Sequence, residues 1–222
     1  MHETVFTHAL GLLALTIITL LPIMNPLSTC PLLLALTQGW DIESRQRLAR
    51  RVCLYSFGIL AVFLFAGERI IHIFSISIEG IRIAGGLIIC RVGFDMLMPG
   101  EDREVAQAKL LQAQPNHDIA FTPLAMPTLA GPGSISVILS MVSSAPENTQ
   151  LIYLMMIALG MGLTVLIAFA VLHAATSYVH LISQTALDAF TRIMGFLLVC
   201  IAVQFVLSGV TEFIRNTSFG LH

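Results

Sequence analysis

The sequence predicts an all-α integral membrane protein with six transmembrane helices in two inverted three-helix repeats, the first helix of each repeat being broken by proline and glycine. Three observations lead to this prediction. Hydrophobic residues make up 56% of the 222 residues and charged residues only 11%, whereas a soluble domain carries about a quarter charged residues. Apolar segments run along the whole chain, and the mean hydropathy is +0.88. One stretch of sequence also recurs in the second half of the chain.

The first predicted span is an uncharged segment that contains three prolines. Residues 4–40 include no Asp, Glu, Lys or Arg, and the segment is longer than the ~20 residues that cross a bilayer as a helix. Because Pro22, Pro26 and Pro31 lie inside it, we expect this span to be broken near its middle.

The other spans follow from later apolar segments. They are predicted at residues 52–74, 78–98, 119–142, 151–172 and 193–211. The loop DIESRQRLARR is expected before the second span. The third span is the least apolar because it contains Arg82, Arg91 and Asp95. The fourth is interrupted by prolines and glycines, as the first is.

The distribution of Lys and Arg predicts the orientation, because cytoplasmic loops are enriched in both. The chain divides into a first repeat at residues 1–98, a polar cytoplasmic linker at 99–118 and a second repeat at 119–222. Six spans place most basic residues on one side, which we expect to be cytoplasmic, with both termini outside. These residues are Arg45, Arg47, Arg50, Arg51, Arg103, Lys109 and Arg192. Three spans in each half make the two repeats inverted.

The repeat is visible as an alignment without gaps. RIAGGLIICRVGFDML, beginning at Arg82, aligns with RIMGFLLVCIAVQFVL, beginning at Arg192. Apolar bias alone explains matches of Leu and Ile, but not matches of Arg, Gly and Cys in one register. Those identities are Arg82/Arg192, Gly85/Gly195 and Cys90/Cys200.

The first spans of the two halves also correspond, in one of two registers. One superposes the equally spaced prolines, Pro22, Pro26 and Pro31 on Pro123, Pro127 and Pro132. The other superposes Asn25-Pro26 on Gly131-Pro132. Either register places a helix break in the first span of each half.

The paired breaks are the candidate substrate site. Proline frees backbone polar groups, and irregular backbone at membrane depth is tolerated only where protein buries it or where it lines a wet cavity. Half-helix N-termini suit a carboxylate, whereas freed carbonyls and nearby hydroxyls suit an ammonium group or a small cation. The alternative is two kinked helices with an internally capped backbone. The candidate substrate-binding residues are Asn25, Pro26, Ser28, Thr29, Ala130, Gly131, Pro132, Gly133 and Ser134.

Arg91 and Asp95 are spaced i, i+4 and face the same way on a helix. An ionisable pair in a membrane span is a candidate relay, and a structural ion pair near the cytoplasmic end is the other interpretation. The four cysteines form no CxxC pair and are expected to be small core residues. No metal or cofactor is expected.

Two segments resemble the MarC family of membrane proteins. They are NPLSTCP, which follows an apolar run, and PLAMPTLAGPGSISVIL. RIAGGLIICRVGFDML is similar to the third span of that family. The resemblance covers nearly the whole chain and implies a six-helix protein of the bacterial inner membrane. It also implies kinship with archaeal transporters of small neutral amino acids. The family name comes from an association with multiple antibiotic resistance, which does not establish drug export.

We therefore expect a transporter of small solutes, neutral amino acids or similar metabolites, that works by alternating access around the broken helices. The alternatives are an uncoupled channel or facilitator, a drug efflux protein and, less favoured, a membrane-embedded enzyme or redox carrier. The expected partners are the lipid bilayer and a small-molecule substrate. A coupling ion (proton or sodium) and a homo-oligomer remain open. The net charge of −2 gives no reason to expect nucleic acid.

Overall fold

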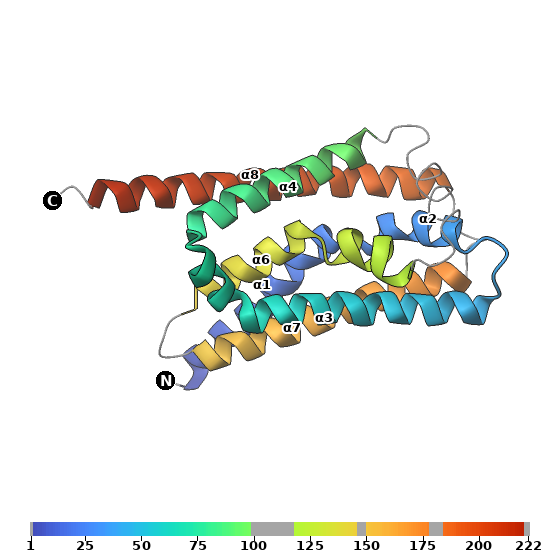
Figure 1. Cartoon of the computed structure of the whole chain (residues 1–222), viewed down its shortest axis with the longest axis horizontal. Coiled ribbons are helices and arrows are strands. Elements are labelled where there is room, and N and C mark those ends of the chain that lie inside the picture. The colour runs from blue at the N-terminus through green and yellow to red at the C-terminus, as the bar shows by residue number, and fades with distance from the viewer. Residues whose placement is uncertain (1, 99–117, 146–149, 178–183, 220–222) are drawn as a thin grey trace.

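All described secondary structure in the computed structural model is helical (Figure 1). The structure describes residues 2–98, 118–145, 150–177 and 184–219, and these contain no strand. The predicted all-α class is therefore confirmed. The helices are α1 (His2–Met24), α2 (Pro26–Leu36), α3 (Ile42–Phe74), α4 (Ile78–Leu97), η1 (Ala120–Leu129), α6 (Pro132–Ser143), α7 (Gln150–Ser177) and α8 (Gln184–Phe219).

Four segments of the described chain are long and apolar enough to cross a membrane. They are Leu10–Leu36, Ile42–Phe74, Gln150–Ser177 and Ala189–Asn216. The pair formed by η1 and α6, which is bent by 56°, makes a fifth if it is counted as one span. The remaining long helix, α4, has 20 residues but contains Arg82, Arg91 and Asp95.

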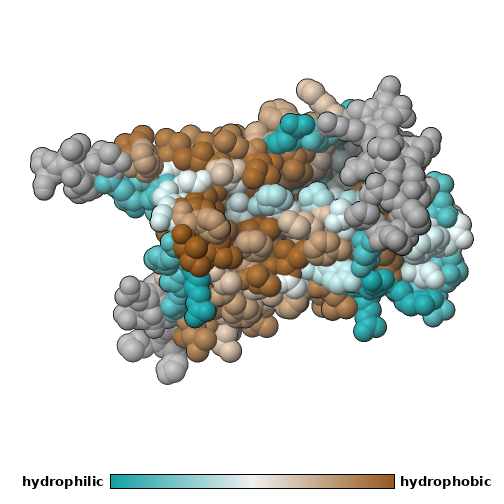
Figure 2. Space-filling view, viewed as in Figure 1, coloured by the Kyte–Doolittle hydropathy of each residue, from teal (hydrophilic) through white to brown (hydrophobic). Residues whose placement is uncertain are grey.

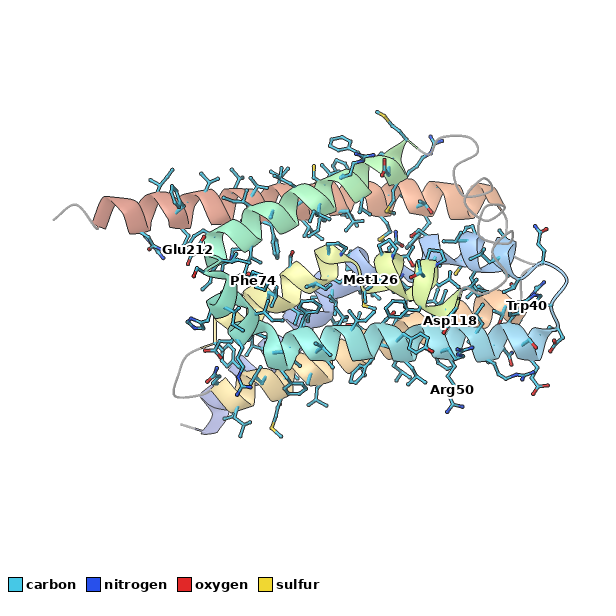
Figure 3. All side chains as sticks on the ribbon, in the orientation of Figure 1. Trp40, Arg50, Phe74, Asp118, Met126 and Glu212 are labelled. Carbon is cyan, nitrogen blue, oxygen red and sulfur yellow. The ribbon has the colours of Figure 1, made fainter. Side chains whose placement is uncertain are left out.

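The helices run between two ends of the molecule (Figure 3). Trp40, Arg50 and Asp118 lie at one end, and Phe74 and Glu212 lie at the other. The first will be called the arginine-rich end, because α3 begins there with its cluster of arginines. Apolar side chains dominate the visible face between the two ends (Figure 2), as expected for a surface that contacts lipid.

The prediction of a loop at residues 41–51 is wrong, because α3 already begins at Ile42. The carboxylate of Asp41 caps the helix by accepting a hydrogen bond from the Ser44 amide at 2.9 Å. Hydrogen bonds from Ser44 also lower the pKa of Asp41. Good helix formers such as Arg, Gln, Leu and Ala follow this cap, so the charged segment continues the helix instead of forming a loop.

α4 and α8 form an antiparallel pair beside the other helices (Figure 1). Glycines bring the two backbones close together. A Cβ at Gly86 would lie 2.8 Å from the carbonyl oxygen of Ala202, and one at Gly93 would lie 2.9 Å from that of Gly195. On the other side of the molecule, α1 packs against α7. There a Cβ at Gly160 would lie 2.7 Å from Thr16 Cβ.

Candidate functional site

The first helix break is made by one residue, Asn25, between α1 and α2. Its backbone is left-handed, with φ 37° and ψ 68°, a conformation that asparagine tolerates better than most residues. The side-chain oxygen of Asn25 accepts a hydrogen bond from the Ser28 amide at 3.4 Å, and Pro26 occupies the first turn of α2. The hydroxyl of Ser28 donates to the Asn25 carbonyl at 3.0 Å, and that of Thr29 does so at 3.4 Å.

The second break lies between η1 and α6. η1 is a wide, irregular helical segment with non-helical backbone at Thr122 and Met126, and cis peptide bonds precede Pro123 and Pro127. Gly131 then takes an extended conformation as the cap residue of α6, without a side-chain cap. A Cβ at Gly131 would overlap the carbonyl oxygen of Pro127, so this close approach requires glycine.

The two breaks share one pattern, which decides between the two sequence registers. Asn25 and Gly131 are both cap residues, and Pro26 and Pro132 both begin the helix that follows. The helix ends thus follow the register that superposes Asn25-Pro26 on Gly131-Pro132. Three residues after each cap is a serine whose hydroxyl bonds to backbone. Ser28 donates to the Asn25 carbonyl at 3.0 Å, and Ser134 donates to the Leu129 carbonyl at 3.0 Å.

The breaks meet at the middle of the molecule. A Cβ at Gly133 would lie 3.3 Å from Ile23 Cγ2, next to the first break, and 2.9 Å from Ile89 Cγ1 of α4. The Asn25 amide donates to Met96 Sδ of α4 at 3.1 Å. Met126, beside the second break, lies midway between the two ends of the molecule (Figure 3).

α2 and α6 lead away from this point in opposite directions. The Thr37 carbonyl, just after α2, accepts a bond from Arg45 at the arginine-rich end. α6 ends shortly before α7, whose first residue, Gln150, bonds to Glu68 near the other end of α3. With 11 and 12 residues, the two half-helices are ~16 and ~18 Å long. Each half-helix is thus about half as long as a hydrocarbon core of ~30 Å is thick.

The electrostatics of this region come mainly from the backbone. Both α2 and α6 have their N-termini at the breaks, and neither has an acidic residue in its first turn. The first N–H groups of a helix lack partners within that helix and carry a partial positive charge. Two such ends converge here, so the region is suited to an anionic group such as a carboxylate.

The predicted site residues lie together around these ends and are mostly buried. Asn25 is 6% exposed, and Thr29 and Ser134 are each 1% exposed. Pro26, Ala130, Gly131 and Gly133 are also buried, Ser28 is partly buried, and Pro132 is exposed. The hydroxyls bond to nearby carbonyls, whereas the Asn25 amide has only a thioether as acceptor. A thioether is a weak acceptor, so a ligand oxygen can replace it at small cost.

The sequence prediction missed the part that α4 plays in the site. Ile89 and Met96 are buried against the two breaks, but both are ordinary apolar residues of an apolar helix. Two glycines on the same face, Gly85 and Gly93, are what indicates from sequence that this side of α4 is closely packed.

Arg91 and Asp95 form the predicted ion pair at 3.3 Å, but they do not face the breaks. Their side chains are 68% and 47% exposed, and at 100° per residue they lie on the face of α4 opposite Ile89 and Met96. The geometry favours the structural interpretation over the relay. The cysteines are free, with Cys30 and Cys53 buried, and no group of potential metal ligands occurs among the described residues.

These features define a class: multi-pass helical membrane proteins in which two broken helices meet at the middle of the molecule. The chain belongs to the MarC family of integral membrane proteins, whose family model matches residues 10–214. It is 37% identical to the inner membrane protein MarC of Escherichia coli (strain K12) and to that of Shigella flexneri. In both cases the match covers 92% of this chain and 96% of the relative. No solved structure is significantly similar. The protein is thus a multi-pass protein of the bacterial inner membrane.

Proposed function

We propose that this protein transports small solutes across the inner membrane and binds them between the two helix breaks. The observation that carries the proposal is the meeting of two half-helix N-termini, those of α2 and α6, from opposite ends of the molecule. Such paired discontinuous helices at mid-membrane are typical of the substrate sites of secondary transporters. In the proposed cycle of alternating access, each half-helix opens the site to one side of the membrane.

The proposed architecture has six spans in two inverted repeats, with α4 as the third span. The antiparallel pairing of α4 with α8 supports it. Near the middle of α4 a Cβ at Gly86 would lie 2.7 Å from Val206 Cγ2, and near its C-terminal end Met96 Cβ would lie 2.9 Å from a Cβ at Gly195. When α4 and α8 are superposed so that Arg82 lies on Arg192, Met96 falls on Val206 and Gly86 falls one residue from Gly195. The first contact therefore corresponds to the second to within one residue. A local two-fold relation between equivalent third helices accounts for this.

The proposed substrate is a small neutral amino acid. Its carboxylate would lie between the N-termini of α2 and α6, where no acidic residue competes with it. The side-chain amide of Asn25, which has only the Met96 thioether as acceptor, would donate to that carboxylate, and the ammonium group would bond to backbone carbonyls freed at the breaks. Ile23, Ile89 and the glycines around them offer apolar and backbone surface to the side chain, which favours a small uncharged one.

Counterflow in proteoliposomes tests this function. We expect liposomes containing the purified protein and loaded with unlabelled L-alanine to take up labelled L-alanine, glycine or L-serine. Asn25→Asp should abolish counterflow, because it adds a negative charge where the carboxylate binds but keeps the helix cap. Asn25→Gly, which suits the left-handed backbone, should weaken counterflow by about tenfold or more, as expected for the loss of charge-assisted hydrogen bonds. Both variants should keep the elution profile of the wild type.

The matched control is Gln38→Glu, the same amide-to-carboxylate change at an exposed residue between α2 and α3. It should leave counterflow unchanged. The absence of uptake, counterflow and binding for every neutral amino acid would refute the proposed substrate class. Net flux that is unaffected by collapsing the proton and sodium gradients would show an uncoupled facilitator instead.

A further inference from the structure

One face of α8 is polar in an otherwise apolar helix. Gln204, Ser208, Thr211 and Arg215 recur at intervals of four, three and four residues, so they lie on the same side of the helix. In the described part of the chain, none of the four side chains makes a hydrogen bond or an ion pair. All four fall in the apolar segment Ala189–Asn216. Lipid cannot satisfy such groups, so this face must meet water or protein.

The structure places a wide-open cavity of ≈ 410 Å³ along this face. Its lining includes the four polar residues of α8 together with Glu212 and, from α4, Arg82. The volume falls in the range of small-molecule pockets, about 300–1,000 Å³. Glu212 lies at the end of the molecule opposite the arginine-rich end (Figure 3). If the arginine-rich end is cytoplasmic, the cavity opens on the outer side of the membrane.

Arg82 lines this cavity and also bonds to the half-helix that begins at the second break. Its guanidinium donates to the hydroxyls of Ser140 and Ser144 on α6, each at 2.9 Å, and pairs with Glu212 of α8. One side chain therefore connects α4, α6 and α8. Ser140 lies eight residues beyond Pro132, so the barrier is ~12 Å from the second break along α6. Any movement of α6 away from α8 at this end would break one of these bonds.

The charges of the cavity match those of a zwitterion. Arg82 and Glu212 neutralise each other, which leaves Arg215 without an ion-pair partner among the described residues. A carboxylate can bind Arg215 and the neighbouring hydroxyls of Ser208 and Thr211. An ammonium group can then compete with Arg82 for Glu212. Both ends of an α-amino acid thus find complementary groups, and binding of the ammonium weakens the bond that holds the barrier closed.

We propose that this cavity is an outer vestibule in which the amino acid docks on Arg215 and Glu212, closed on its inner side by Arg82. The vestibule rests on the proposed function, because its solute is the one that the helix breaks would bind. It adds a second site, distinct from those breaks, and a named barrier between the two.

Thiol labelling tests whether the cavity is open to water. The four native cysteines are replaced by alanine, and one cysteine is introduced at Ser208, Thr211 or Val210. A membrane-impermeant maleimide added outside should label Ser208→Cys and Thr211→Cys at least about tenfold faster than Val210→Cys, because thiols react as thiolates in water. Val210 is 40% exposed but lies on another face of α8. Equal labelling rates at the three positions would overturn the vestibule, whatever the protein transports.

Two further variants test the barrier and the docking. Glu212→Gln should speed outside labelling of Ser136→Cys, one turn deeper on α6, because Arg82 loses its charged partner.

Arg215→Gln should raise the KM for L-alanine counterflow about fivefold or more with little change in kcat, whereas Arg69→Gln, at the same end of the molecule, should not. If Arg215→Gln leaves the KM unchanged while Asn25→Asp abolishes counterflow, the docking role is wrong and the central site stands. If the wild type transports nothing, the proposed function itself fails.

Discussion

Single residues set the geometry of both helix breaks. Asn25 turns the chain through a left-handed conformation and caps α2 with its side chain. Gly131 instead lets the backbone pass against the carbonyl oxygen of Pro127. The two breaks therefore use different chemistry for one purpose, which is to begin a new helix in the middle of the molecule.

The loss of stability caused by replacing a glycine with alanine should depend on which atoms the added Cβ would meet. Gly131→Ala should lower stability more than Gly133→Ala, because the first methyl meets rigid backbone and the second meets the flexible side chain of Ile89. Overpacking of this kind costs ~1–3 kcal/mol. Gly58→Ala is the control, since nothing lies within 4 Å of its added Cβ, and it should be neutral or slightly stabilising. Thermal unfolding in detergent would measure the order, and a more stable Gly131→Ala variant would contradict it.

At the scale of elements, α3 extends beyond the membrane. Its 33 residues span ~50 Å, more than the ~30 Å of the hydrocarbon core. We therefore expect the first turns, with Arg45, Arg47, Arg50 and Arg51, to lie outside the bilayer. Arg51 pairs there with Asp118 at 2.9 Å, which ties the start of α3 to the chain just before η1.

The cap of α3 should depend on pH. The pKa of Asp41 is lowered by its hydrogen bonds with Ser44, so the folded helix favours the carboxylate. The stabilisation is present above the ordinary pKa of aspartate, about 3.9, and is lost as pH falls through the lower value of the folded state. Protection of the Ser44 amide from hydrogen exchange should decrease over that range. In the Asp41→Asn variant the amide side chain caps the helix without ionising, so protection should not change with pH; a parallel decrease would contradict the prediction.

At the scale of the whole molecule, α1 begins and α8 ends at the same end of the structure (Figure 1). An even number of spans produces this arrangement, whereas five spans would place the two chain ends on opposite sides. The arginines at the start of α3 lie at the other end, which the positive-inside rule assigns to the cytoplasm.

Reporter fusions should reveal this topology. Alkaline phosphatase fused after α8 should be active, because the enzyme folds only outside the cytoplasm, and green fluorescent protein at the same place should be dark. The control is a pair of fusions between residues 98 and 118, within the predicted cytoplasmic linker, where the two results should be reversed. A fluorescent C-terminal fusion would exclude six spans with both termini outside. That linker falls almost wholly outside the described residues, so its cytoplasmic location stays a prediction.

The sequence by itself determined the helical membrane class, the family and the two broken spans, because hydropathy and proline act locally along the chain. It predicted the ends of α4 closely but missed the helical start of α3, since charge alone does not distinguish a loop from a helix outside the membrane. Only the tertiary structure chose the register of Asn25 with Gly131, brought Ile89 and Met96 of α4 against the breaks, and turned Arg91 and Asp95 away from them. Those outcomes depend on how helices distant in sequence pack, and apolar residues of one helix look alike until a neighbour selects a face.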